Sequence, residues 1–83
     1  MYRTQETQMV LEKVTGIIAN VCSIHPALIV ADRDLMAYGM DSARAMDLVV
    51  EVEDAFNVEI SDEVMIGLRT ANDIVQALAN LAV

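Results

Sequence analysis

One serine in this chain, Ser42, has the surroundings of a residue that carries a covalent group. It closes the run YGMDS at residues 38–42 and precedes a patterned stretch that predicts a helix over Ala43–Phe56. Helix N-termini expose unpaired N–H groups and the positive end of the helix dipole, so a phosphate on Ser42 would be stabilised there. Gly39 permits a positive φ, and Asp41 is a good N-cap. A plain helix-start serine fits the same positions, so the pattern permits modification without identifying the group.

The helix predicted after Ser42 has an apolar and a charged stripe. The apolar stripe predicts a buried face, and it consists of Ala45, Leu48, Val49, Val52 and Phe56. The charged stripe consists of Arg44, Asp47, Glu51 and Asp54, and Met46, Val50 and Glu53 lie between the two stripes. Most charge runs are solvated faces. Beside a modified serine, an acidic stripe favours docking to basic partner surfaces.

Arg44 is out of place in this pattern. It puts a positive charge in the first helical turn, where the helix dipole disfavours it. Three roles stay open beside that of a plain solvated side chain: pairing with Asp47, reaching a phosphodiester on Ser42, or contacting an acidic partner.

Three further helices must position this segment. Val10, Val14, Ile17 and Val21 recur at helical spacing, and the intervening residues 23–41 have no sustained period except for a possible helical turn near 34–37. Ser61 is the expected cap of a short third helix, and Thr70 with Asp73 three residues on is a variant of the capping box. The sequence therefore predicts helices over residues 4–21, 43–56, 62–66 and 71–81, with a long first loop.

Size and charge limit the possible functions. The chain has 83 residues, enough for one domain over residues 1–83, and a formal net charge of -8 with a pI of about 4.2. Such acidity argues against nucleic acid and anionic membrane surfaces as partners. One cysteine allows no internal disulfide, and no apolar stretch approaches the ~20 residues that span a bilayer. We therefore expect a soluble, cytoplasmic monomer.

Metal binding and catalysis have no support in the pattern. Cys22 and His25 lack a second pair to complete a zinc site, and the run from Asp32 to Asp34 lacks the rest of a calcium loop. The single histidine has no expected partner near Ser42. We expect no metal site and no catalytic activity.

Several segments together resemble the acyl carrier protein family. They are GMDS at residues 39–42, the acidic helix DLVVEVEDAF at 47–56, VEISDE at 58–63 and TANDIV at 70–75. The resemblance covers about residues 32–81, and the first predicted helix fits in length and pattern. Their order in a short acidic chain makes the resemblance far more specific than a lone Asp-Ser pair.

The resemblance implies a fold and a function. The fold would be all-α, a four-helix antiparallel bundle with a long first loop and a short third helix. Ser42 would receive 4′-phosphopantetheine from coenzyme A through a phosphopantetheinyl transferase, with Asp41 and Gly39 beside it. The thiol of that arm would hold an acyl group as a thioester for fatty-acid, polyketide or related enzymes. The protein would be a freestanding carrier that supplies tethering and recognition.

The same resemblance suggests a partner surface and a cargo pocket. Partner enzymes with basic docking patches would contact Arg44, Met46, Asp47, Val50, Glu51, Glu53 and Asp54. The acyl chain would lie between the second and third helices, against residues chosen from periodicity alone: Val49, Val52, Ile60, Leu68 and Ile74.

Two departures and two rival functions accompany this interpretation. The family usually has leucine directly after the serine, where this chain has Ala43, followed by Arg44; these changes indicate a dedicated set of partners. One rival is an aminoacyl or peptidyl carrier of a non-ribosomal synthetase, although such carriers more often have Gly-Gly-His-Ser at this point. The other is an acidic helical adaptor that is never modified.

Overall fold

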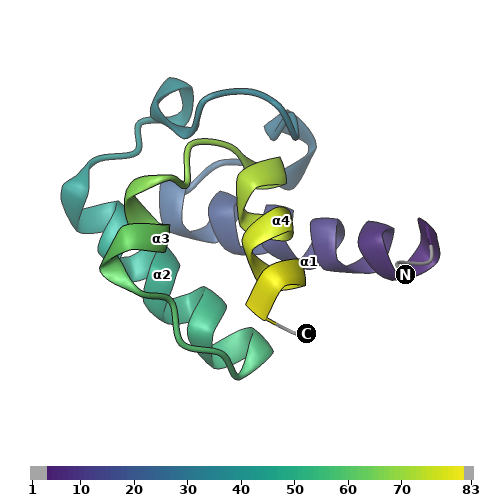
Figure 1. The fold of residues 1–83 in the computed structure, drawn as a ribbon. Coiled ribbons are helices and arrows are strands. Elements are labelled where there is room, and N and C mark those ends of the chain that lie inside the picture. Colours follow the sequence, from purple (N-terminus) through teal and green to yellow (C-terminus); the bar gives the residue numbers. More distant parts are fainter. Residues whose placement is uncertain (1–3, 82–83) are drawn as a thin grey trace.

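The computed structural model describes residues 4–81. Its elements in chain order are α1 (Thr4–Cys22), η1 (Pro26–Leu28), η2 (Leu35–Tyr38), α2 (Ser42–Phe56), α3 (Asp62–Ile66) and α4 (Ala71–Leu81), where η denotes a 3₁₀ turn (Figure 1). Within this range there are four α-helices and no strand. The predicted all-helical fold with a long first loop and a short third helix is confirmed. No helix in residues 4–81 has the length and apolar character needed to cross a bilayer.

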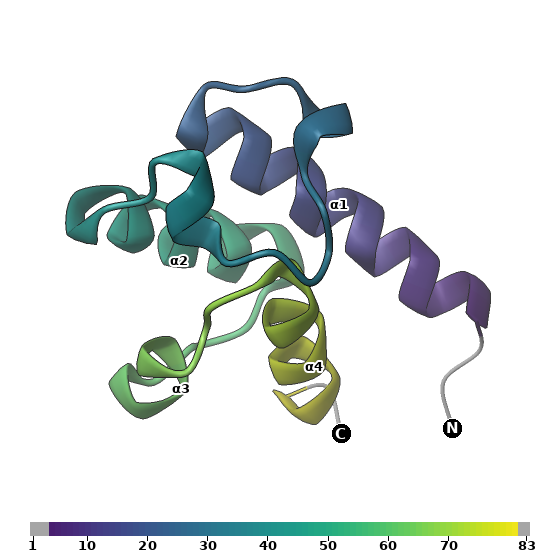
Figure 2. The same cartoon turned by 90° about the horizontal axis from the view of Figure 1, so that it is seen from above.

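The core lies where α1 meets α2 and α4. α1 packs against both helices, and Figure 2 shows α1 and α2 running in opposite directions. The largest fully buried side chains come from these three helices: Val14, Ile18, Val52 and Ile74. This aliphatic packing is the scaffold that holds the start of α2 in place.

The starts of the two shorter helices follow the predicted caps. Ser61 Oγ accepts from the Val64 N–H at 3.3 Å. At α4, Thr70 Oγ1 accepts from the Asp73 N–H at 3.1 Å, while the Asp73 carboxylate accepts from the Thr70 N–H at 3.2 Å. This reciprocal pair is the predicted capping box with Asp in place of Glu.

The long connection from α1 to α2 is an ordered strap over the core. The Leu35 N–H donates to the Arg69 carbonyl at 2.8 Å, and the Asn72 N–H donates to the Ala31 carbonyl at 2.9 Å. These bonds satisfy loop backbone groups that helices cannot pair. Within the connection, the Tyr38 hydroxyl accepts from the Val30 N–H at 2.7 Å. The predicted turn is confirmed as η2, whereas η1, which begins at Pro26, was not predicted.

Candidate functional site

Ser42 is the first residue of α2, and its side chain is exposed. The preceding Asp41 is extended and provides the predicted cap: its carboxylate accepts from the Arg44 N–H at 2.8 Å. The Asp41 carbonyl accepts from the Ala45 N–H, also at 2.8 Å. Because Asp41 caps the helix, the helix start does not require the Ser42 hydroxyl, which stands at the positive end of α2.

A tight turn leads into this serine. Gly39 ends η2 with φ 84°, and its N–H donates to the Met36 carbonyl at 3.1 Å. A Cβ placed on Gly39 would lie 3.6 Å from Arg44 Nη1, an ordinary van der Waals separation. The backbone conformation, not lack of space, therefore favours glycine here.

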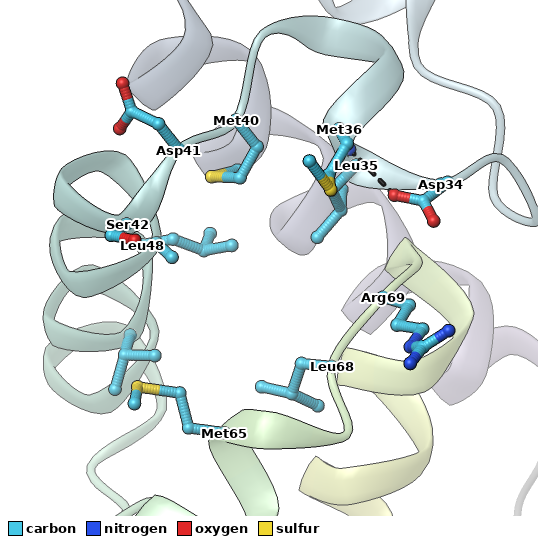
Figure 3. Close-up of a pocket in the computed structure, with 12 residues that line it drawn as sticks. Asp34, Leu35, Met36, Met40, Asp41, Ser42, Leu48, Met65, Leu68 and Arg69 are labelled. Carbon is cyan, nitrogen blue, oxygen red and sulfur yellow. Dashed lines mark hydrogen bonds between the residues drawn. The ribbon is translucent and has the colours of Figure 1, made fainter.

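Ser42 stands at the edge of a partly open hollow of about 660 Å³. Figure 3 shows the hollow between the start of α2, η2 and the segment that joins α3 to α4. Its lining is Asp34, Leu35, Met36, Met40, Asp41, Ser42, Ala45, Leu48, Val49, Met65, Leu68 and Arg69. Most of these side chains are apolar, and three are methionines. Methionine adapts its shape to irregular contacts, so this lining suits a flexible apolar group.

The predicted acyl-pocket residues divide between this hollow and the core. Val49 and Leu68 line the hollow. Val52 and Ile74 are each only 1% exposed and belong to the core cluster, and Ile60 packs against that cluster. Helical periodicity identifies side chains that face inward, but it does not separate a filled core from a hollow beside it, so the acyl pocket itself stays a prediction.

The lining residues that the sequence did not predict come mostly from aperiodic segments. Leu35, Met36 and Met40 lie in or beside η2, and Met65 lies in the five-residue α3. For Leu35, Met36 and Met40, the one available signal was their apolar character within a long loop, which indicated burial but no particular contact.

The acidic residues of α2 do not share one environment. Asp47 and Asp54 are exposed. Glu51 instead accepts from the Asn20 side chain of α1 at 3.2 Å, and Glu53 accepts from the Ile60 N–H at 2.8 Å, so both also hold neighbouring segments in place. Beside Asp47 and Asp54, Met46 is 56% exposed and Val50 is 51% exposed. The exposed face of α2 thus combines two carboxylates with two apolar side chains.

Arg44 folds back over the turn that precedes Ser42. Its Nη1 donates to the Gly39 carbonyl at 3.4 Å, while its backbone N–H is the group capped by Asp41. This intramolecular contact beside Ser42 is a role that the sequence did not predict for Arg44.

Cys22 is the one thiol of the chain, and it is buried at the end of α1. Burial raises the pKa of the Cys22 thiol; the Arg44 charge partly offsets this effect and the Asp41 charge adds to it. A buried thiol with a raised pKa is a weak nucleophile. No group of three or more residues able to hold a metal ion occurs within residues 4–81.

A family model described as a phosphopantetheine attachment site matches residues 12–78. The match contains the whole of α2, the hollow and most of the core helices. The prosthetic group of this family is therefore 4′-phosphopantetheine, and an exposed serine at a helix N-terminus beside an apolar hollow suits its attachment.

Relatives with known names agree with this match. The acyl carrier protein of Onion yellows phytoplasma (strain OY-M) is 40% identical over 68 residues, which are 81% of this chain and 90% of that protein. The non-reducing polyketide synthase pkiA of Emericella nidulans is 35% identical over 68 residues, 82% of this chain but only 3% of that much longer protein.

A solved structure extends the likeness to the fold. The acyl carrier protein from Thermotoga maritima superposes with a TM-score of 0.82 over 98% of this chain and 95% of that one, at 21% identity. The family match covers both the helices and the serine-bearing turn. The chain belongs to the acyl carrier protein family and is a carrier protein with a phosphopantetheine attachment domain.

Proposed function

We propose that Ser42 carries the phosphopantetheine arm and that the protein presents acyl intermediates to fatty-acid, polyketide or related biosynthetic enzymes. The observation that carries the proposal is the place of Ser42: exposed, first in α2, and at the edge of the apolar hollow. When attached, the arm supplies a terminal thiol that holds the acyl group as a thioester. The protein acts as a carrier without catalysis of its own.

Attachment uses the Ser42 hydroxyl as the acceptor. Its oxygen forms a bond to the phosphorus of the phosphopantetheine moiety, the pyrophosphate bond of coenzyme A breaks, and adenosine 3′,5′-bisphosphate leaves. The hydroxyl proton passes to a base of the transferase. The start of α2 then stabilises the negative phosphodiester through its N–H groups and dipole.

The exposed face of α2 is the proposed docking surface for the transferase and the acyl-processing enzymes. Asp47 and Asp54 attract basic patches, and Met46 and Val50 add a small apolar contact. Glu51 and Glu53 contribute charge from the edges of this face while holding their intramolecular bonds. Such a surface gives fast, salt-sensitive and weak association, which suits a carrier that must leave each partner.

An acyl cargo is favoured over an aminoacyl or peptidyl one. The hollow beside Ser42 is lined mainly by Met, Leu and Val side chains, which match an alkyl chain better than a charged amine. The 40% identical phytoplasma relative bears the name acyl carrier protein, and Asp41 replaces the histidine typical of the peptidyl type. These features support the acyl assignment without selecting a pathway.

Intact mass of the purified protein tests the attachment site. We expect a gain of one phosphopantetheine after treatment with coenzyme A, magnesium and a broad-specificity transferase, and no gain for Ser42→Ala. Ser61→Ala is the matched control, because Ser61 is also an exposed serine at a helix start. Modification of Ser42→Ala would disprove the site. If the wild-type protein gained no mass while a competent control carrier was modified in parallel, the result would favour the unmodified adaptor or a carrier whose Ala43 and Arg44 require a dedicated transferase.

Loading of the modified protein tests the cargo. Acyl and aminoacyl ligases of known specificity are offered separately, and the mass of the loaded carrier is measured. We expect acyl loading; efficient aminoacyl loading with no acyl loading would favour the peptidyl carrier. We also propose that the protein is cytoplasmic and monomeric. Light scattering of the purified protein tests its oligomeric state.

A further inference from the structure

The turn before Ser42 is held differently on its two sides. On the η2 side, the Gly39 N–H donates to the Met36 carbonyl at 3.1 Å. On the α2 side, Asp41 is held through its carboxylate and carbonyl by N–H groups of the first helical turn. Gly39 itself adopts φ 84°, a left-handed conformation at the joint between η2 and α2. The orientation of Ser42 relative to η2 thus depends on what connects Gly39 to α2.

Arg44 makes that connection. Its backbone N–H donates to the Asp41 carboxylate at 2.8 Å, and its Nη1 donates to the Gly39 carbonyl at 3.4 Å. The guanidinium also lies in van der Waals reach of the position that a Gly39 Cβ would occupy. One residue of α2 therefore contacts both ends of the Gly39–Asp41 turn. The Arg44 side chain is half-buried, which agrees with this folded-back position.

This contact offers a reason for a positive charge where the helix dipole disfavours one. The long 3.4 Å bond adds little to global stability, because a net hydrogen bond is weak and this one is near the outer limit of the distance range. Its expected effect is to restrict the backbone conformation of the turn at Gly39.

We propose that Arg44 is a positioning residue for the transfer of phosphopantetheine to Ser42: its guanidinium holds the Gly39 carbonyl and so fixes the turn that orients the Ser42 hydroxyl. The inference rests on Ser42 being the attachment site. It goes further, because it assigns a positioning role to a side chain that is bonded to the turn before the serine and not to the serine itself.

Steady-state kinetics of the transfer test the proposal. The variant Arg44→Met keeps an unbranched apolar stem and loses the guanidinium donors. We expect its kcat to fall about threefold, the scale of one weak hydrogen bond, with KM for the carrier unchanged. Arg44→Lys retains a charged donor and should recover most of the lost kcat. A rise in KM with unchanged kcat would overturn the proposal, because that pattern means that Arg44 contacts the transferase.

Arg33→Met is the matched control. Arg33 is an exposed residue of the connection from α1 to α2, and its loss changes the net charge by the same amount as the loss of Arg44. We expect wild-type kinetics from this variant. An equal fall in kcat would mean that the Arg44 effect comes from the change in net charge, and it would overturn the proposal.

Amide hydrogen exchange of the unmodified variants gives a readout without any enzyme. The Gly39 N–H should exchange faster in Arg44→Met than in Arg33→Met, and equal rates would also overturn the proposal.

If Ser42 is not the attachment site, the mass measurement gives a result that the Arg44 kinetics do not. In that case the wild-type protein would gain no mass, or Ser42→Ala would still be modified. Neither result depends on the substitutions at Arg44.

Discussion

The helices α2 and α4 each have an aspartate near their start whose carboxylate accepts from backbone N–H groups, but their first turns are enclosed to different degrees. At α4, the Asp73 carboxylate accepts from the N–H groups of Arg69 and Thr70, and the Thr70 hydroxyl accepts from the Asp73 N–H. Two backbone hydrogen bonds also join this region to the strap: the Leu35 N–H donates to the Arg69 carbonyl, and the Asn72 N–H donates to the Ala31 carbonyl. At α2, Asp41 caps the helix, while Ser42 stays exposed beside a hollow.

The difference separates two uses of the same helix-start chemistry. The polar groups at the start of α4 form hydrogen bonds that stabilise the fold, and Ile74 of this helix lies in the core. The start of α2 is capped from the residue before the helix, so the first helical residue is available for chemistry. Substitutions at α4 should therefore change stability, whereas those at α2 should mainly change modification.

The largest effect should come from Ile74→Ala. Ile74 is 1% exposed in the first turns of α4 and packs with residues of the other core helices. Removing its buried side-chain atoms should lower the free energy of unfolding by about 3 kcal/mol. Urea denaturation followed by circular dichroism measures this. A loss below about 1 kcal/mol would show that the start of α4 is not the rigid one of the pair.

The two aspartates give a direct comparison. Asp73→Ala leaves two backbone N–H groups without their acceptor and should cost about 2 kcal/mol. Asp41→Ala removes one cap acceptor and should cost about 1 kcal/mol. Both are measured by thermal unfolding. Equal costs would remove the distinction between the two helix starts.

Gly39→Ala tests whether the turn before Ser42 requires a positive φ. The left-handed conformation should cost an alanine about 1.5 kcal/mol, since the space for a Cβ is present. Gly67→Ala is the control: Gly67 has φ -84°, and its Cβ would lie 3.5 Å from the Val64 carbonyl oxygen. That variant should be neutral or slightly stabilised. Similar losses for both would point to crowding rather than backbone conformation.

The smallest effects compare two hydroxyl groups. Thr70→Ala removes the acceptor of the Asp73 N–H and should cost about 1 kcal/mol. Ser42→Ala should change the free energy of unfolding by less than about 0.5 kcal/mol, because the helix is capped by Asp41. Calorimetry of the unmodified proteins measures both changes in the free energy of unfolding. A larger loss for Ser42→Ala would assign the Ser42 hydroxyl to the fold.

Local sequence signals predicted the helices and their starts. The bounds of α3 and the caps Asp41, Ser61 and Thr70 agree with the structure because a cap depends on residues within one turn of it. α1 and α2 differ from their predicted bounds by one residue each.

The hollow was harder to predict, because it depends on contacts between segments far apart in sequence. Met40, from the turn before α2, and Met65, from α3, both line it, and no periodic pattern connects them. The predicted pocket instead included Val52 and Ile74, which fill the core. Likewise, the bond from the Ile60 N–H to the Glu53 carboxylate joins the α2–α3 connection to α2, and it could not be predicted from the charge of Glu53 alone.

The cross-links of the strap also have a consequence for the order of folding. Bonds from Leu35 to Arg69 and from Asn72 to Ala31 join opposite halves of the chain. Contacts of such large sequence separation require closure of a long loop, so they form after the local helices have appeared. The segment that leads into Ser42 should thus be among the last parts of the molecule to gain order. Transient opening of this segment would expose Leu35, which is buried in the core cluster.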